Sequence, residues 1–520
     1  MRKSIQRLFS KPAARAFRHA LVWFSIALGA LFAGSALWIR HTFGPVSVDQ
    51  LLMHLPGSGG AESSSSEGDY LLSFVRRAVL LPLLVVGGVA FSYYLVVRRL
   101  RLSREAAQQG RQRRGARTVV AGLAAFAVLL GGVLAFGDSI RLAEYAQASA
   151  ASGSMADYYV SPVADVQTVL ETPEEPKNLI TIFLESTEES FSDTTVFETD
   201  MMQPLNEVTE EWSRFSALNM YEGSGWTMAG ITGTECGIPL RGIGDFSFGV
   251  NHNDIGADNS GYMSGAVCIG DVLKRAGYEN VFMGGADAGF AAKRNYLTAH
   301  GYDQVQDLGY WQSRGETEIS PVWGLSDRRL MENAKQEVTR LYEQDQPFSL
   351  TLLTLDIHEP LHLFESCDIT TLDPAESVQR CSASAVADFI SYLGEEGYLD
   401  DTVVFITGDH EKMLADGVAF TERLQGKTSR PLYNRLWSPD AVEIERSKID
   451  QLSVYATLLD VLDLGREDGR AGVGVSALVP EAEVTGMVAL QPEEYQALVK
   501  SRSRDLYRHI WLKEELSPAS

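Results

Sequence analysis

Three long uncharged segments constrain the fold of this chain more than any other feature. Residues 20–39, 78–97 and 118–137 contain no charged side chain. A helix rises about 1.5 Å per residue, so each segment can cross a hydrocarbon core of roughly 30 Å. We therefore predict three transmembrane helices in a membrane region spanning residues 1–139. A cleaved signal peptide is the alternative for the first segment, but its apolar run is long and Leu37–Arg40 offers no small-residue cleavage pattern.

Arginine and lysine are distributed unevenly around these segments. They accumulate before the first span, from Arg2 to Arg18, and between the second and third spans, from Arg98 to Arg117. The loop between the first two spans carries only Arg40 and the boundary pair Arg76-Arg77. The positive-inside rule predicts a multi-pass protein of the inner or plasma membrane with a cytoplasmic N-terminus. Three spans then place everything after residue 137 outside the cytoplasm.

Net charge divides the chain into two unlike parts. The total of −23 separates into +11 for residues 1–139 and −34 for residues 140–520. Such an acidic larger part argues against a general affinity for nucleic acid, and the basic tract beside two spans is better explained by topology.

All four cysteines fall in the predicted exterior part. Proximity in the sequence favours the pairs Cys236–Cys268 and Cys367–Cys381, and free buried thiols are the alternative. The sequence contains no CxxC motif and no Cys/His cluster that would indicate structural zinc.

The exterior part reads as an α/β domain. A juxtamembrane linker over 140–177 leads to a catalytic domain over 178–480 and a helical tail over 481–520. Short apolar runs predict strands at 178–184, 280–283, 348–355 and 402–407. Amphipathic patterns around residues 330–341 and 386–393 predict helices between them. Alternating strands and helices predict a mostly parallel sheet with helices on both faces.

Metal-ligating side chains follow three of these strands. Glu185 follows the first, Asp356 and His358 follow the third, and Asp409-His410 follow the fourth. Because ligands bind beyond the carboxyl ends of parallel strands, these side chains predict a divalent-metal site at one sheet edge. Carboxylates with an imidazole suit Mn²⁺ or Mg²⁺, and Zn²⁺ less well. Singly, each residue could instead cap a helix or sit in an ordinary loop.

A hydroxyl for covalent chemistry stands in the segment Glu222–Gly230. Thr227 follows a glycine-rich turn and lies at a predicted helix start, where free backbone N–H groups favour a phosphate oxyanion. From the spacing alone, an N-cap threonine without chemistry is equally compatible with this pattern.

Several motifs, in one order, resemble a known family. The chain resembles the glucan-modifying phosphoglycerol transferases, relatives of lipoteichoic acid synthase in the alkaline-phosphatase and sulfatase superfamily. The resemblance runs from about residue 156 to 476 and is carried by Asn178–Ser186, Gly225–Gly230, Glu235–Leu240, Cys268–Tyr278, Phe290–Lys293, His300–Asp303, Trp323–Asp327 and Asp409-His410.

The resemblance implies roles for individual residues. Glu185, Thr227, Asp409 and His410 are its expected metal ligands, and Thr227 is also the expected nucleophile. Lys293 and His358 occupy the positions of a basic phosphate contact and of a histidine that contacts the glycerophosphate. Residues 411–413 depart from the family pattern, which leaves the acceptor open.

The implied activity is a metal-dependent transfer of glycerophosphate. Phosphatidylglycerol is the expected donor, and a glycan or teichoic-acid-like polyglycerol phosphate outside the membrane is the expected acceptor. Metal coordination lowers the pKa of the threonine hydroxyl for in-line attack on phosphorus. A membrane-anchored phosphodiesterase or sulfatase-type hydrolase is the alternative, although Thr227 lacks the sulfatase Cys/Ser-x-Pro/Ala-x-Arg setting. A metal-free sensor or scaffold is a further alternative.

Overall fold

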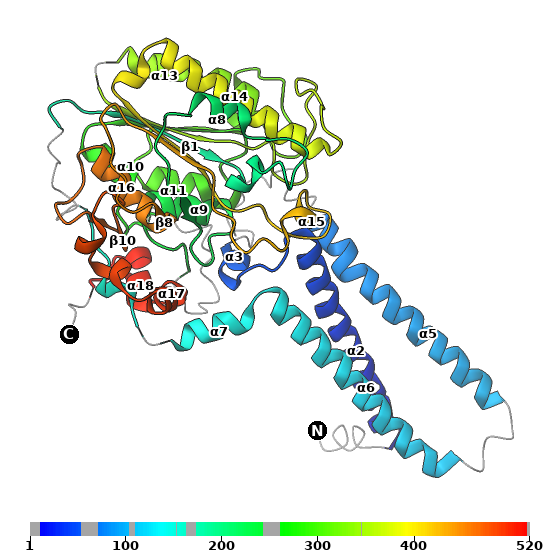
Figure 1. The fold of residues 1–520 in the computed structure, drawn as a ribbon. Coiled ribbons are helices and arrows are strands. Elements are labelled where there is room, and N and C mark those ends of the chain that lie inside the picture. The colour runs from blue at the N-terminus through cyan, green and yellow to red at the C-terminus, as the bar shows by residue number, and fades with distance from the viewer. Residues whose placement is uncertain are drawn as a thin grey trace. The chain divides into compact units, whose positions relative to one another are not determined.

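The computed structural model describes residues 11–53, 71–102, 110–151, 153–162, 173–242, 261–344 and 346–516 (Figure 1). The chain forms two compact units. One contains the long N-terminal helices. The other, called the α/β unit below, contains the described residues 49–53 and the chain from Ala146 onward apart from Ala415–Gly417. The basic segment 1–10 and residues 103–109 of the basic loop, on which the orientation prediction depends in part, lie outside the described residues.

Three long helices form the N-terminal unit. They are α2 (Lys11–Thr42), α5 (Leu81–Leu102), which continues the π-helical turn η1 (Val75–Leu80), and α6 (Gly110–Ser139). By length and composition, the helical stretches Phe17–Thr42, Leu71–Arg99 and Val119–Ser139 can each cross a membrane, in agreement with the three predicted spans. Helices α2 and α6 approach closely at Gly132, where a Cβ atom would lie 2.1 Å from the Gly29 carbonyl oxygen. Small residues at such contacts are typical of packed membrane helices.

The α/β unit is built on a six-stranded sheet. Its order is β4 (Gln304–Gln306), β3 (Glu279–Gly284), β5 (Phe348–Leu353), β1 (Asn178–Leu184), β6 (Thr402–Gly408) and β7 (Asn434–Trp437). All neighbours pair in parallel except β6 and β7. The sequence predicted β1, β3, β5 and β6, and β1 occupies a central position between β5 and β6. Strand β5 ends two residues before its predicted end, because Leu355 N donates to the Asp327 side chain instead of continuing the ladder.

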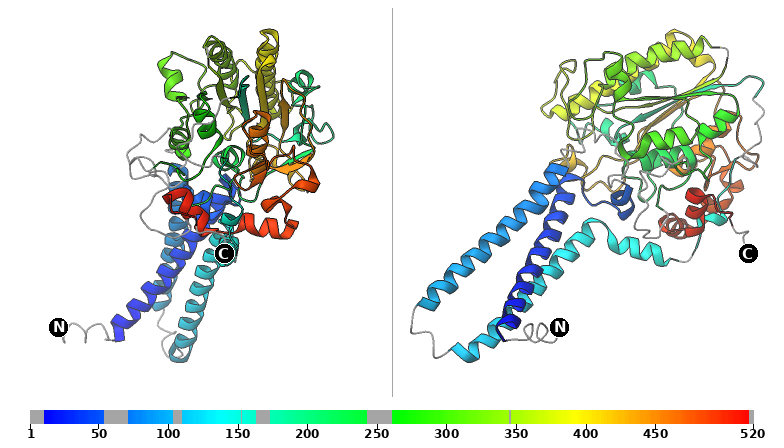
Figure 2. Two further views of the ribbon diagram at one scale, coloured as in Figure 1. Left: turned by 90° about the vertical axis from the view of Figure 1, so that its left-hand side faces the viewer. Right: turned by 180° about the vertical axis from the view of Figure 1, so that it is seen from behind.

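Helices cover both faces of this sheet, as the alternating pattern predicted (Figures 1 and 2). One face packs against α8 (Gln203–Val208), α13 (Asp327–Tyr342) and α14 (Pro374–Glu395) through side chains such as Ile182, Leu352 and Ile406. The other face packs against α9 (Thr227–Cys236), α10 (Ile269–Arg275), α11 (Lys293–Ala299) and α16 (Val454–Val461). Side chains on both faces of each buried strand therefore pack in hydrophobic cores, which explains the continuous apolar runs in the sequence.

The remaining α-helices and β-strands of the described chain are short. They are α3 (Val48–Met53), α7 (Leu142–Ala150), α12 (Leu308–Ser313), α15 (Thr421–Leu424), α17 (Pro492–Lys500), α18 (Arg504–Leu512), β2 (Ala217–Asn219), β8 (Lys448–Asp450), β9 (Arg470–Ala471) and β10 (Gly474–Val475). Helix α18 buries Leu506, Tyr507 and Trp511 in the core that also contains α9. The C-terminal helices are thus part of the α/β unit.

Both predicted disulfides are confirmed. Cys236 pairs with Cys268, and Cys367 pairs with Cys381.

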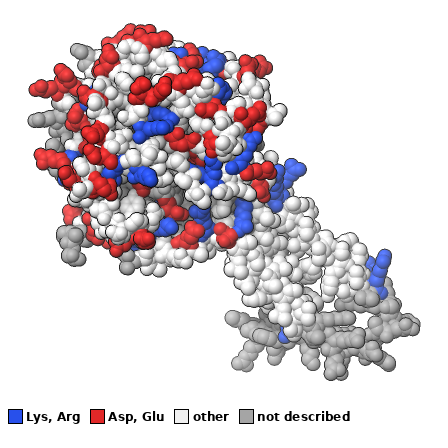
Figure 3. Space-filling view, viewed as in Figure 1, with Lys and Arg blue, Asp and Glu red and all other residues white. Residues whose placement is uncertain are grey.

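The two units differ in surface charge. Acidic and basic side chains are interspersed over the α/β unit, whereas the described part of the long helices shows few charged side chains on the face drawn in Figure 3.

Candidate active site

Two neighbouring strands bring the predicted acidic ligands together. Leu184, the last residue of β1, pairs in register with Gly408, the last residue of β6. Glu185 and Asp409 therefore follow at the same level of the sheet edge, and Asp409 N donates to the Leu184 carbonyl at 3.1 Å. Both side chains are buried. The parallel pairing is the physical reason that residues 224 positions apart in the sequence share one site.

Ser186 fixes both carboxylates. Its hydroxyl donates to Glu185 Oε1 at 2.6 Å, and its backbone N–H donates to Asp409 Oδ1 at 2.8 Å. The residue adopts φ 51°, a left-handed conformation that is uncommon for a serine. Backbone strain of this kind persists where the surroundings enforce it, and it is common at functional sites. Sequence reasoning did not assign a role to Ser186.

Glu185, Asp409 and His410 form a group that can hold a metal ion. One ligand atom from each lies within 4.8 Å of the others, and all three residues are buried. Asp409 Oδ2 has no hydrogen-bond partner in the described part of the chain. His410 Nδ1 lies 2.8 Å from the Glu411 carbonyl, so this nitrogen carries the proton and Nε2 is left for coordination. The donor set and the unpartnered buried oxygen fit a hard divalent cation.

The pKa values of Glu185, Asp409 and His410 are shifted because two carboxylates and an imidazole are buried next to one another. Burial raises the pKa of Asp409 to about 7; His410 opposes this shift and the charge of Glu185 adds to it. Burial alone would raise the pKa of Glu185, but the neighbouring His358 and His410 lower it below its ordinary value. Burial would lower the pKa of His410, but Asp409 and Glu185 outweigh it and raise that pKa. The two acids thus oppose each other's ionisation, and a cation bound between them would offset that repulsion.

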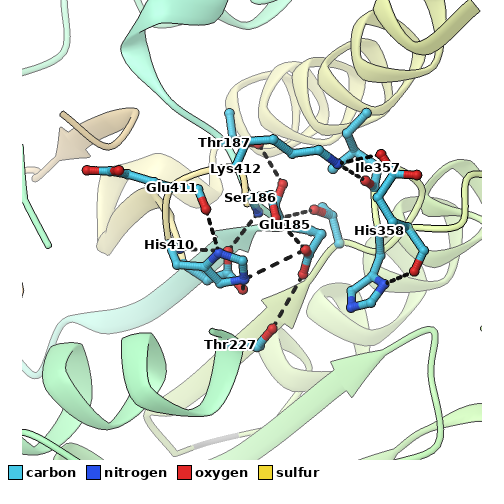
Figure 4. A network of polar contacts seen from close by, with 12 residues as sticks. Glu185, Ser186, Thr187, Thr227, Ile357, His358, His410, Glu411 and Lys412 are labelled. Carbon is cyan, nitrogen blue, oxygen red and sulfur yellow. Dashed lines mark hydrogen bonds and ion pairs between the residues drawn. The ribbon is translucent and has the colours of Figure 1, made fainter. Parts of the chain in front are cut away.

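Thr227 lies beside this group. It is the first residue of α9, and its Oγ1 lies 3.4 Å from Glu185 Oε2 (Figure 4). The side chain is half-buried. Helix α9 can approach the cluster because residue 230 is glycine: a Cβ atom there would lie 1.9 Å from the Asp409 carbonyl oxygen. The structure therefore brings together all four residues that the sequence analysis named as metal ligands.

Lys293 places a buried cation near the same carboxylates. It begins α11, and the residue is only 7% exposed. Burial lowers the pKa of its ammonium, and the charges of Glu185 and Asp409 partly offset that effect. A cation in this position can interact with an anionic substrate group.

His358 lies close to the cluster but does not belong to its ligand set. Its ring packs against Trp323, with centroids 4.0 Å apart, and its Nδ1 lies 2.9 Å from the Glu359 carbonyl. Burial lowers the pKa of His358, although the charge of Glu185 opposes this. Trp323 Nε1 donates to the same Glu359 carbonyl at 3.1 Å. The tryptophan motif of the sequence therefore orients the histidine.

The expectation that Asp356 would join the metal site is wrong. Its Oδ1 accepts a hydrogen bond from the backbone N–H of Asp327 at the start of α13, at 3.2 Å. Asp327 in turn accepts from the backbone N–H groups of Leu355 and Asp356. The two acids tie β5 to α13, a structural role that strand-end position alone does not distinguish from metal binding.

Lys412 is a site residue that the sequence analysis left without a role. It is almost fully buried, and its Nζ donates to the Ile357 carbonyl at 2.7 Å and lies 3.2 Å from Glu359 Oε1 (Figure 4). The residue thus connects the segment after β6 to the segment that carries His358.

A second group of potential ligands does not make a metal site. Cys268, Asp271 and His300 lie close together, but the sulfur of Cys268 is in the disulfide with Cys236. His300 Nδ1 lies 2.7 Å from Asp271 Oδ2, and that oxygen also accepts from Cys268 N at the start of α10. Without a thiolate, this group is a helix cap.

Comparison with known proteins shows which family this chain matches. The Sulfatase family model matches residues 177–464. Phosphoglycerol transferase I of Xanthomonas campestris pv. campestris (strain B100) is 31% identical over 363 residues, covering 64% of this chain and 48% of that protein. Phosphoglycerol transferase I of Escherichia coli O6:K15:H31 (strain 536 / UPEC) is 28% identical over 339 residues, covering 62% and 41%. The chain thus spans about half the length of the curated relatives it matches.

Among solved structures, lipoteichoic acid synthase LtaP from Listeria monocytogenes aligns at 16% identity and a TM-score of 0.47, covering 66% of this chain and 96% of that one. The family model covers more than half of the present sequence and contains the strand ends and the helix start that carry Glu185, Thr227, Asp409 and His410. The chain therefore belongs to the sulfatase family, within the alkaline-phosphatase and sulfatase superfamily.

Proposed function

We propose that this protein is a membrane-anchored, metal-dependent transferase that moves glycerophosphate from phosphatidylglycerol to a glycan or polyglycerol-phosphate acceptor outside the membrane. The observation that carries the proposal is the position of the Thr227 hydroxyl, 3.4 Å from Glu185 and next to Asp409 and His410. Relatives named phosphoglycerol transferase I support the choice of substrate class.

Glu185, Asp409, His410 and Thr227 are the residues that would hold the cation, with Mn²⁺ our first choice and Mg²⁺ or Zn²⁺ as alternatives. When bound, a divalent cation lowers the pKa of a coordinated hydroxyl and offsets charge on the phosphoryl oxygens. The two carboxylates contribute charge, and Ser186 holds both of them in place.

In the first half-reaction, Thr227 Oγ1 attacks the phosphorus of the lipid headgroup. The bond from Oγ1 to phosphorus forms, the bond from phosphorus to the diacylglycerol oxygen breaks, and diacylglycerol leaves with a proton that replaces the one lost by the Thr227 hydroxyl. The free N–H groups at the start of α9 and the ammonium of Lys293 stabilise the phosphoryl oxygens. Glycerophosphate then remains on Thr227 as an ester.

In the second half-reaction, an acceptor hydroxyl attacks the same phosphorus, the bond from phosphorus to Thr227 Oγ1 breaks, and Oγ1 takes up a proton from solvent, which restores the threonine hydroxyl. We assign the proton from the acceptor hydroxyl to Nε2 of His358. The Glu359 carbonyl can only accept a hydrogen bond, so Nδ1 of His358 carries the ring proton and Nε2 has the free lone pair. Burial lowers the pKa of His358, which keeps the ring neutral and able to accept a proton at pH 7.

The membrane region supports a lipid donor. Three helices of sufficient length and apolarity precede the α/β unit, and a tethered catalyst meets lipid headgroups at high effective concentration. The arginine-rich flanks support an orientation with the N-terminus in the cytoplasm and the α/β unit outside it.

The test uses the full-length protein in lipid nanodiscs with headgroup-labelled phosphatidylglycerol and Mn²⁺. We expect acid-stable label on the wild-type protein, none on Thr227→Ala, and slower labelling of Thr227→Ser, which keeps a hydroxyl. Adding candidate glucans should move the label from the protein to the glucan. Release of free glycerophosphate in the presence of acceptor would instead support the hydrolase, and equal labelling of Thr227→Ala would refute the nucleophile.

A further inference from the structure

A buried carboxylate in the α/β unit comes from an unexpected part of the sequence. Asp49 stands between the first and second predicted spans, in the short helix α3, yet it belongs to the α/β unit. Both of its carboxylate oxygens lie 2.6 Å from Arg502 Nη1, and Oδ1 also accepts from Gly242 N at 3.2 Å. Arg241 Nη1 lies 3.6 Å from Oδ2. One acid thus faces two arginines.

Both arginines are buried as deeply as the acid. The side chains of Asp49, Arg241 and Arg502 are 7%, 9% and 4% exposed. Arg502 comes from the segment between α17 and α18, and its Nη2 donates to the Gly242 carbonyl at 3.2 Å. Removing one partner from a buried ion pair leaves a charge without compensation, so loss of the Asp49 carboxylate would remove the charge that compensates both guanidiniums.

The other arm of Arg241 reaches the turn that precedes the proposed nucleophile. Arg241 Nη2 donates to the Glu222 carbonyl at 3.1 Å and to the Val499 carbonyl at 2.7 Å. The adjacent Gly223 has φ +100°, a backbone conformation that favours glycine. A Cβ atom on that glycine would lie 3.6 Å from Arg241 Nη1, which shows how closely the guanidinium packs against the turn.

From this turn the chain leads directly to Thr227. Ser224 N donates to the Tyr221 carbonyl at 3.1 Å, and Trp226 N donates to the Ser224 carbonyl at 2.8 Å. Helix α9 then begins at Thr227. A continuous path of polar contacts and five residues of chain therefore runs from Asp49 through Arg241 and Glu222 to the hydroxyl.

We propose that Asp49 is a positioning residue: through Arg241 it holds the turn over residues 222–226, and thereby Thr227, in the geometry for attack. The segment between the first and second predicted spans thus supplies a residue that the α/β unit needs for catalysis. The link from Asp49 to the turn stands on contacts alone, and only its effect on turnover rests on the proposed transferase function.

The experiment compares wild type, Asp49→Asn and Asp49→Glu as full-length proteins in nanodiscs, by hydrogen exchange at the turn and by transferase kinetics. Glu376→Gln is the matched control, because Glu376 is a fully buried acid paired with Arg423 and touches no residue of the turn in the described structure. We expect at least fivefold faster exchange of the Ser224 and Trp226 amides in Asp49→Asn, a tenfold or greater fall in kcat with KM nearly unchanged, and intermediate values for Asp49→Glu.

The readouts separate the two proposals. Exchange at the turn that is unchanged in both Asp49 variants, or raised equally in Glu376→Gln, overturns the positioning role. Faster exchange together with a fall in kcat/KM, partly restored in Asp49→Glu, supports the positioning role. If wild type transfers no glycerophosphate but the turn still loosens only in the Asp49 variants, the link stands and the proposed function fails. Asp49→Glu keeps the charge, so it provides the exchange measurement if Asp49→Asn does not fold.

Discussion

Replacing Asp409 by asparagine should make the metal-free protein more stable at alkaline pH while abolishing its response to metal. In the wild type, burial raises the pKa of Asp409 from 3.8 to about 7. At 1.36 kcal/mol per pKa unit, this shift corresponds to about 4 kcal/mol. Because the folded pKa exceeds the unfolded one, the stabilisation is fully present below pH 4 and is lost as the pH rises through 7. Asparagine is neutral throughout and escapes this loss.

The asparagine should also fit the site. Asp409 Oδ1 accepts from the backbone N–H groups of Ser186 and His410, both at 2.8 Å, and an amide oxygen can accept the same bonds. The amide nitrogen would replace Oδ2, which has no hydrogen-bond partner in the described structure, beside the carboxylate of Glu185. With ethylenediaminetetraacetate at pH 8, we therefore expect the variant to be more stable than wild type by as much as about 4 kcal/mol.

Metal should reverse that order. A ligand at 100 times its dissociation constant stabilises the folded state by about 2.7 kcal/mol, and only the wild type keeps both carboxylates to bind it. The assay is thermal unfolding of the full-length protein by tryptophan fluorescence, with chelator or with Mn²⁺. Asp450→Asn is the control, because Asp450 is a half-buried acid bonded to Tyr495 outside the metal group, and its response to Mn²⁺ should match wild type.

Two results would refute this reasoning. The first is an Asp409→Asn variant that is less stable than wild type in chelator at pH 8, because the buried charge would then carry no penalty. The second is a full Mn²⁺ shift in the variant, because Asp409 would then not be a ligand.

Three further perturbations test other parts of the molecule. Lys293→Met should lower kcat/KM by about 10²-fold, which corresponds to roughly 3 kcal/mol of transition-state stabilisation. Thermal stability should not fall, because the substitution removes a buried ammonium. Unchanged kinetics would contradict the role of Lys293. Lys412→Met removes the donor to the Ile357 carbonyl and should reduce the free energy of unfolding by about 2–4 kcal/mol in denaturant titrations, a loss that Lys412→Arg should partly restore. Replacing Cys367 and Cys381 by serine opens a loop with a sequence separation of 14 and should cost about 3 kcal/mol, and the double variant should no longer respond to reductant at this loop.

Local pattern predicted four strands of the six-stranded sheet, but neither of its edge strands, β4 and β7. Apolar runs rich in β-branched residues predicted β1, β3, β5 and β6, because strands buried on both faces need such side chains. The long uncharged segments predicted three helices that are long and apolar enough to cross a membrane. Residues after strand ends were predicted to meet, and Glu185 met Asp409 and His410 because parallel strands share their carboxyl edge.

The same pattern did not separate ligands from structural acids. Asp356 follows a strand as Glu185 does, but it turns to the start of α13. The sequence also held no local signal for Lys412, whose partners lie 53 to 55 residues away, or for the close approach that requires glycine at position 230.

The sequence by itself determined four central strands, the helical segments long and apolar enough to cross a membrane, and the residue types available for phosphoryl chemistry, because these depend on periodicity and composition over a few turns of chain. Only the tertiary structure decided that β1 lies between β5 and β6, that Thr227 faces Glu185, and that Asp49 joins Arg241 and also Arg502, which is 453 positions away. Such contacts arise from the packing of whole elements against each other, which no window of the sequence contains.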